Sequence, residues 1–81
     1  MKELTLDCRD GMTAIHELLA RELAFPEWYG RNLDALFDCL TDLAEDISVT
    51  LLYPELLPGL TAVLNDASAD NPLIHLHIIV E

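Results

Sequence analysis

The 81-residue chain contains few basic residues: four Lys and Arg stand against fifteen Asp and Glu, which gives a formal net charge of −11 at pH 7. Nucleic acids and anionic membranes attract proteins through positive charge, so this composition argues against either as a direct ligand. The favoured partners of such a chain are basic proteins. The shortage of basic residues therefore argues against nucleic-acid-binding and membrane-binding functions.

Long hydrophobic segments are also absent. No apolar run approaches the 18 or so residues of a membrane-spanning helix. The residues that follow Met1 alternate polar with apolar and do not form the continuous stretch of a secretory signal, so we expect a cytoplasmic protein. Apolar residues still make up 52% of the chain, which excludes intrinsic disorder, and the length fits a single domain over residues 1–81.

Cysteine is scarce as well, with two residues in the chain. They permit one disulfide, but a cytoplasmic location favours free thiols, and we expect Cys8 and Cys39 to be small buried apolar residues. No zinc-site spacing of cysteine and histidine is present. His75 and His77 share one strand face without a clear third ligand, so ordinary histidines are favoured over metal binding, and no cofactor is predicted.

Alternation of apolar and polar residues with period two predicts three strands. They are Glu3–Cys8, Ile47–Tyr53, with Tyr53 facing inward, and Leu73–Val80. A strand, helix, strand, helix, strand order implies right-handed crossovers and a parallel sheet. The predicted fold class is α/β, with helices on one face of a three-stranded parallel sheet and an open face that carries Thr5, Asp7, Ser48, Thr50, His75 and His77.

Helical periodicity predicts the intervening helices. The first is N-capped by Thr13 and runs to about Ala24. The segment Glu55–Ala69 forms one helix or two short pieces, since Pro58 interrupts its pattern, and the best helical stretch is Leu60–Ala69.

The most informative segment runs from Phe25 to Asp42, where a loop with two large aromatics leads into a short helix that Asn32 is well suited to cap. Placing residues about every 100° around the axis puts apolar side chains on one face and acids on the face roughly opposite. The apolar residues are Leu33, Leu36, Phe37, Leu40 and Leu43; the acids are Asp34, Asp38, Asp42 and Glu45.

This line of acids is locally unfavourable. Like charges four residues apart cost about 0.2 to 0.5 kcal/mol per pair, and Asp42 lies near the negative end of the helix. A binding surface is one interpretation; the other is an ordinary solvated face in a chain rich in acids. Among the loop aromatics we expect Trp28 to be exposed and to contact a partner. Tyr29 is expected to contact the partner too, with packing beneath Trp28 as the alternative.

The run from Pro26 to Leu40, PEWYGRNLDALFDCL, closely resembles the core motif of the barstar family of intracellular ribonuclease inhibitors, approximately P-E-aromatic-Y-G-x-N-L-D-A-L-W-D-C-L. The resemblance implies a barstar-like two-layer fold. It also implies a protein that plugs the basic active site of a secreted ribonuclease, with aspartates where the substrate phosphates bind.

Carried over position by position, Asp38 matches the dominant acid of the family, and Trp28 with Tyr29 matches the aromatic pair over the catalytic centre. This chain departs from the pattern at Phe37, where tryptophan is usual, and at Asp42 and Leu43, where a small residue and an aromatic are usual. The partner-binding residues that the resemblance implies are Trp28, Tyr29, Gly30, Asn32, Leu33, Asp34, Phe37, Asp38, Asp42, Glu45 and Asp66.

These observations favour a stoichiometric inhibitor of the antitoxin or immunity type, acting on a basic extracellular-type ribonuclease or ribonuclease toxin, and a monomer when free. The alternative is a barstar-like acidic module that binds another basic protein, such as a different toxin or a nucleic-acid-binding factor. An enzyme is disfavoured, because Asp34 and Asp38 on an exposed helix lack the enclosing pocket that separates the pKa values of a catalytic pair.

Overall fold

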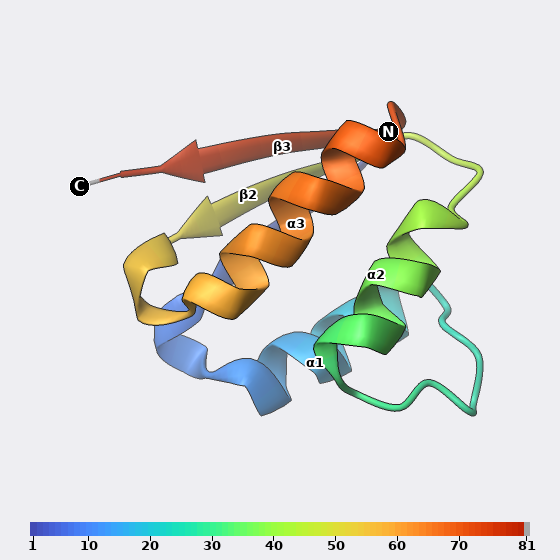
Figure 1. Ribbon diagram of the computed structural model, residues 1–81, viewed down its shortest axis with the longest axis horizontal. Coiled ribbons are helices and arrows are strands. Elements are labelled where there is room, and N and C mark those ends of the chain that lie inside the picture. The colour runs from blue at the N-terminus through green and yellow to red at the C-terminus, as the bar shows by residue number, and fades with distance from the viewer. Residues whose placement is uncertain (81) are drawn as a thin grey trace.

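The computed structural model describes residues 1–80, in which helices pack on a three-stranded parallel sheet (Figure 1). The strands are β1 (Lys2–Asp7), β2 (Ile47–Leu52) and β3 (Ile74–Ile79). They lie in the order β1-β2-β3, and Ile47 on the central strand is opposite both Lys2 and Ile74. The predicted α/β fold class is therefore confirmed.

Three α-helices lie in the connections: α1 (Met12–Glu22), α2 (Leu33–Thr41) and α3 (Pro58–Asp70). Two 3₁₀ turns, η1 (Cys8–Asp10) and η2 (Pro54–Leu56), follow β1 and β2. Of the two predicted alternatives for residues 55–69, the structure has two helical pieces, η2 and α3, and Pro58 begins α3 and does not interrupt it. Proline is tolerated in the first turn of a helix because its missing N–H has no intrahelical partner there.

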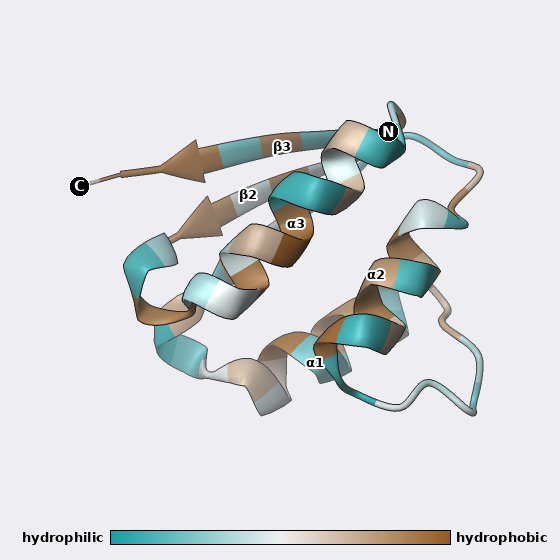
Figure 2. Ribbon diagram, viewed as in Figure 1, coloured by the Kyte–Doolittle hydropathy of each residue, from teal (hydrophilic) through white to brown (hydrophobic). Residues whose placement is uncertain are grey.

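The core lies between the sheet and the helices. Alternate strand residues face this core, as half-buried strands require. The buried ones are Leu4, Leu6, Ile47, Val49, Leu51 and Ile74, and Leu76 and Ile78 on β3 are partly buried against them. The helices contribute Ile15, Leu19, Leu36, Leu40, Leu60 and Leu64. Figure 2 shows hydrophobic and hydrophilic bands alternating along each helix, the pattern of amphipathic helices with one face in a core.

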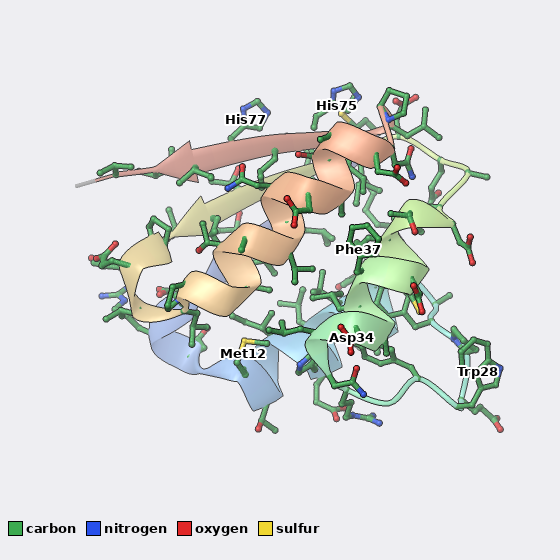
Figure 3. All side chains as sticks on the ribbon, in the orientation of Figure 1. Met12, Trp28, Asp34, Phe37, His75 and His77 are labelled. Carbon is green, nitrogen blue, oxygen red and sulfur yellow. The ribbon has the colours of Figure 1, made fainter. Side chains whose placement is uncertain are left out.

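The opposite face of the sheet is open, as the strand alternation predicts. Thr5, His75 and His77 are exposed there, while Ser48 and Thr50 on the central strand are half-buried. Figure 3 shows both histidines pointing away from the helical layer. His75 Nε2 lies 3.1 Å from Asp46 Oδ1 at the surface.

Two predictions of local structure are wrong. Thr13 does not cap α1, since Gly11 takes a φ of 88°, a conformation that favours glycine, and the helix begins at Met12 without a side-chain cap. Tyr53 is not part of β2, because it adopts a φ of 54° and leaves the strand. Its side chain still packs partly buried against the core, and its ring centroid lies 4.2 Å from the Arg9 guanidinium carbon.

Both cysteines are free thiols. Cys8 is buried, as predicted, whereas Cys39 is half-buried. Burial is the main cause that raises the pKa of each thiol, and nearby acids add to the effect. The two thiols are therefore predominantly protonated at neutral pH. Within residues 1–80, no helix has the length and apolar character needed to cross a membrane.

Candidate functional site

The loop between α1 and α2 presents Trp28 at the tip of a tight turn. The N–H of Tyr29 donates to the carbonyl of Pro26 at 2.9 Å, which makes Glu27 and Trp28 the central residues of the turn. Trp28 is 79% exposed, and Figure 3 shows its ring at the edge of the molecule beside α2. The predicted exposure of this side chain is confirmed.

Tyr29 has the opposite orientation and is only 4% exposed. Its ring packs edge-on against Phe25 at 4.9 Å between centroids, and its hydroxyl lies 2.5 Å from Nδ1 of His16 on α1. Burial raises the pKa of Tyr29 to about 12, so the hydroxyl stays protonated. The expectation that both aromatic rings face a partner is wrong for Tyr29, because this ring anchors the loop that carries Trp28.

His16 is a site-supporting residue that the sequence interpretation misses. It is 5% exposed, and burial, with a smaller contribution from Arg31, lowers its pKa, against a weaker opposing effect of Glu17. The imidazole is therefore neutral at pH 7 and can form one hydrogen bond with the Tyr29 hydroxyl without burying a charge. Its position three residues before Leu19 on the apolar face of α1 is the sequence signal that could have revealed it.

Asn32 caps α2, as predicted. Its side-chain Oδ1 accepts a hydrogen bond from the N–H of Ala35 at 2.8 Å, which satisfies one of the free donors at the helix start. Gly30 is exposed beside it, and a Cβ at this glycine would lie 2.8 Å from Asn32 Nδ2. The cap therefore favours glycine at position 30. Arg31, which has a φ of 50°, forms an ion pair with Glu17 on α1 at 2.6 Å.

The acidic residues of α2 project into solvent. Asp34 lies in the first turn, Asp38 one turn later and Asp42 at the C-cap, and all three are exposed. The ion pairs of residues 1–80 join Arg9 to Asp7, Arg31 to Glu17 and His75 to Asp46, and none of them includes an acid of α2. The negative charge of this surface is therefore not compensated within the described part of the chain.

A groove of about 520 Å³ between α2 and α3 adds another acid to this surface. It is lined by Leu33, Asp34, Phe37, Asp38, Val63 and Asp66. Figure 3 shows Phe37 on the side of α2 that faces α3, and Gly59 allows close approach of the helices, since a Cβ there would lie 3.0 Å from Leu33 Cδ1. The structure thus brings Asp66 together with Asp34 and Asp38. We name this surface, with Asp42, the acidic face.

The acidic face has the chemistry of a binding surface for cations. Carboxylates around an apolar floor can accept charge-assisted hydrogen bonds from a guanidinium or ammonium group while the floor covers its methylene stem. Glu45, in the loop after α2, is exposed but does not line this groove. In residues 1–80 no three His, Cys, Asp or Glu side chains are placed to hold a metal ion.

Two comparisons relate this chain to known proteins. The family described as "Barstar (barnase inhibitor)" matches residues 1–71, a range that includes all the predicted contact residues from Trp28 to Asp66. A protein of Bacillus subtilis (strain 168) named "Putative ribonuclease inhibitor YrdF" is 44% identical over 54 residues. That match covers 64% of this chain and 58% of the relative, so the chain spans less than two thirds of the relative's length.

Proposed function

The chain belongs to the barstar family, and from this premise we propose that it is a stoichiometric protein inhibitor of a basic ribonuclease. The observation that carries the proposal is the acidic face, where Asp34 and Asp38 of α2 and Asp66 of α3 line one groove without compensating bases in residues 1–80, and Asp42 shares a second groove with the exposed Trp28. Its carboxylates take the places of RNA phosphates in the enzyme's cleft. Matching the enzyme's own ligand in charge allows such a protein to block the active site without being a substrate.

Asp34, Asp38 and Asp66 form the centre of the proposed interface. Asp34 and Asp38 are one turn apart on α2, about 6 Å along its axis. Arginine or lysine side chains of the phosphate site can reach these carboxylates across the groove, whose floor of Leu33 and Phe37 excludes water from the ion pairs. Desolvated charge pairs in the middle of an interface contribute far more to affinity than pairs at its rim.

Trp28 and the remaining polar residues surround this centre. An exposed indole on an anchored turn is a favourable hot-spot side chain, because it buries a large area at a small entropic cost. Asn32, Asp42 and Glu45 complete a polar rim, where exposed ion pairs contribute about 0 to 1 kcal/mol each. Tyr29 supports the interface from below, since its buried hydroxyl and ring hold the turn against α1.

The proposed role is that of an immunity-type protein, which neutralises in the cytoplasm a ribonuclease that is toxic before export. Binding, and not catalysis, is the activity proposed. The carboxylates of α2 are exposed along an open groove, which suits the pairing of their charges with a partner's cations.

A second candidate function is an acidic module that binds another basic protein. It is favoured by the rim, where Asp42 and Leu43 replace the small residue and the aromatic of the family motif. Both candidates predict binding that weakens with salt. They differ in whether the bound protein cleaves RNA and whether this chain stops the cleavage.

The proposal is tested by capturing the partner on the immobilised chain from an extract of the source cells, eluting it with salt and assaying it for RNA cleavage. We expect a basic protein that degrades RNA and loses this activity when one equivalent of the chain is added back. Recovery of a basic partner without RNA-cleaving activity, or of a nuclease that the chain does not inhibit, would contradict the proposal.

A matched pair of double variants separates the effect of the acidic face on binding from the effect of net charge. Asp34→Asn with Asp38→Asn removes two charges from α2, whereas Asp10→Asn with Asp70→Asn removes two exposed charges elsewhere. We expect the first pair to weaken inhibition by at least about a hundredfold, as hot-spot acids do, and the second by less than about fivefold. Equal losses would mean that overall charge, and not this face, determines binding.

A further inference from the structure

A second groove lies on the opposite flank of α2, between the helix and the loop that follows α1. Its volume is about 210 Å³, and its lining is Leu23, Ala24, Phe25, Pro26, Trp28, Cys39, Asp42 and Leu43. The walls are apolar and include the exposed indole, and Asp42 contributes the single carboxylate of the lining. We name this feature the Trp28 groove.

Asp42 is poorly placed for the stability of the free protein. It is the C-cap of α2, next to the end of the helix where the carbonyl groups concentrate negative potential. The last turn of α2 contains no basic residue, and Asp42 takes part in no ion pair of residues 1–80. A carboxylate and a helix C-terminus therefore repel each other beside an apolar groove, and an external cation would relieve this repulsion.

We infer that the Trp28 groove binds an arginine side chain of the basic partner. The methylene stem lies along Phe25 and Leu43, and the guanidinium stacks on the ring of Trp28 while it pairs with the carboxylate of Asp42. Arginine matches all three elements, because its planar head stacks on aromatic rings and forms two parallel hydrogen bonds with a carboxylate. A lysine head is a more strongly hydrated point charge and fits the stacked position less well.

This inference rests on the proposed function, since the basic ribonuclease supplies the arginine, and it adds a specificity determinant at the rim. The groove depends on Asp42, which stands where the family motif has a small residue. The subsite therefore distinguishes partners that place an arginine opposite Asp42 from those that place an acid or a hydrophobic residue there. An acid in that position would be repelled by the carboxylate of Asp42 and by the negative end of α2, with no basic residue of the described chain in the lining to offset the repulsion.

Trp28 makes the groove directly observable, because it is the only tryptophan in the chain. The probe is tetra-arginine amide, titrated at low salt into the wild-type protein and two variants while tryptophan emission is recorded. Asp42→Asn removes the carboxylate of the groove. Asp70→Asn is the matched control, since Asp70 is an exposed acid at the end of α3, a helix whose last turn also lacks a basic residue.

We expect a saturable change in Trp28 emission in the wild type. Asp42→Asn should weaken the apparent affinity about five- to tenfold, and Asp70→Asn less than about twofold. Equal weakening in the two variants, or no saturable change in the wild type, would overturn the subsite. Equally tight binding of tetra-lysine amide would overturn the choice of arginine. The peptide titration uses no ribonuclease, so a negative titration does not contradict the inhibitor proposal. A negative capture experiment likewise does not change the result of the titration.

Discussion

At the scale of single residues, two neighbouring aromatic side chains on one loop point in opposite directions. Trp28 is 79% exposed and Tyr29 is 4% exposed, because the turn between Pro26 and Tyr29 directs their side chains to different sides. The buried ring is held by the hydrogen bond to His16 and by Phe25. The position of the exposed indole thus depends on a buried contact with α1.

The His16–Tyr29 pair should make stability depend on pH. Burial lowers the pKa of His16 from its ordinary value of 6.5, so the unfolded chain binds a proton more readily than the folded one. The contribution of neutral His16 is complete above about pH 6.5 and is lost as the pH falls below it. Urea unfolding should therefore give a lower unfolding free energy at about pH 5.5 than at about pH 7.5. His16→Gln should reduce this difference, and an unchanged difference would exclude His16 as its source.

The acids of the interface should differ in importance. Asp38 lines the groove between α2 and α3, where a partner's cation would be desolvated, while Glu45 lies outside that groove. Truncating a central acid strands a buried cation on the enzyme, which costs several kcal/mol, whereas a rim acid contributes about 0 to 1 kcal/mol. In a titration of ribonuclease activity, Asp38→Ala should weaken inhibition much more than Glu45→Ala. Equal effects would count against the central role of Asp38.

Residue-level prediction from sequence succeeds where the cause is local. The exposure of Trp28 follows from its place in a short loop, after Pro26 and beside a charged helix. The burial of Tyr29 depends on His16, thirteen residues earlier, and such a contact exists only after α1 has packed. The grouping of Asp66 with Asp34 likewise requires the packing of α3 against α2, and spacing along the sequence does not encode it.

At the scale of elements, α2 is the helix whose start determines the interface. Asn32 caps it through the N–H of Ala35, and Leu36 and Leu40 fix its inner face in the core at 0% exposure. The outward direction of the acids is therefore set by the helical repeat and by these two buried leucines. A shift at the start of the helix would rotate Asp34 and Asp38 away from the groove that they share with Asp66.

Loss of the cap should be measurable in the free protein. Asn32→Ala removes the acceptor for a helix-start N–H and should lower the unfolding free energy by about 0.5 to 2 kcal/mol. Asn65→Ala is the control, since Asn65 is an exposed residue inside α3, where alanine favours the helix. Chemical denaturation of the two variants and the wild type gives the comparison. A loss in Asn65→Ala as large as in Asn32→Ala would contradict the capping role.

Helices and strands, like single residues, are predicted correctly from sequence where the signal is local. The strands and α2 have strong local signals, namely period-two alternation and an Asn before an amphipathic repeat, and the structure confirms them. Thr13 is a good capping residue by type, yet the positive φ of Gly11 starts α1 earlier. Tyr53 continues the alternation of β2, but Pro54 follows it, and the chain turns out of the strand into η2.

At the scale of the whole molecule, charge and architecture act together. A net charge of −11 favours long-range attraction to basic molecules, and the packing of the helices on the sheet fixes the direction in which the acids of α2 project. None of the four basic residues forms an ion pair with an acid of α2 within residues 1–80. Arg9 pairs with Asp7 and Arg31 with Glu17, and Arg21 forms no ion pair in this range. The ammonium of Lys2 donates to the carbonyl of Glu22.

Long-range attraction predicts a strong effect of salt on the rate of association. Raising NaCl from about 50 to about 500 mM should slow association with the ribonuclease at least about tenfold and change dissociation much less, a pattern for which the barnase–barstar pair is itself the standard example. Stopped-flow mixing with Trp28 emission as the signal measures both rates. An association rate that does not change with salt would exclude steering by the net charge.

The central claim is that the carboxylates of α2 occupy the phosphate site of a ribonuclease. The most direct measurement is the dissociation constant of the complex in the presence of a short, non-cleavable oligonucleotide that binds the same enzyme. If the two compete, an oligonucleotide concentration equal to its own Kd should raise the apparent Kd of the complex about twofold, and higher concentrations should raise it in proportion. A Kd that does not change at saturating oligonucleotide would contradict the claim.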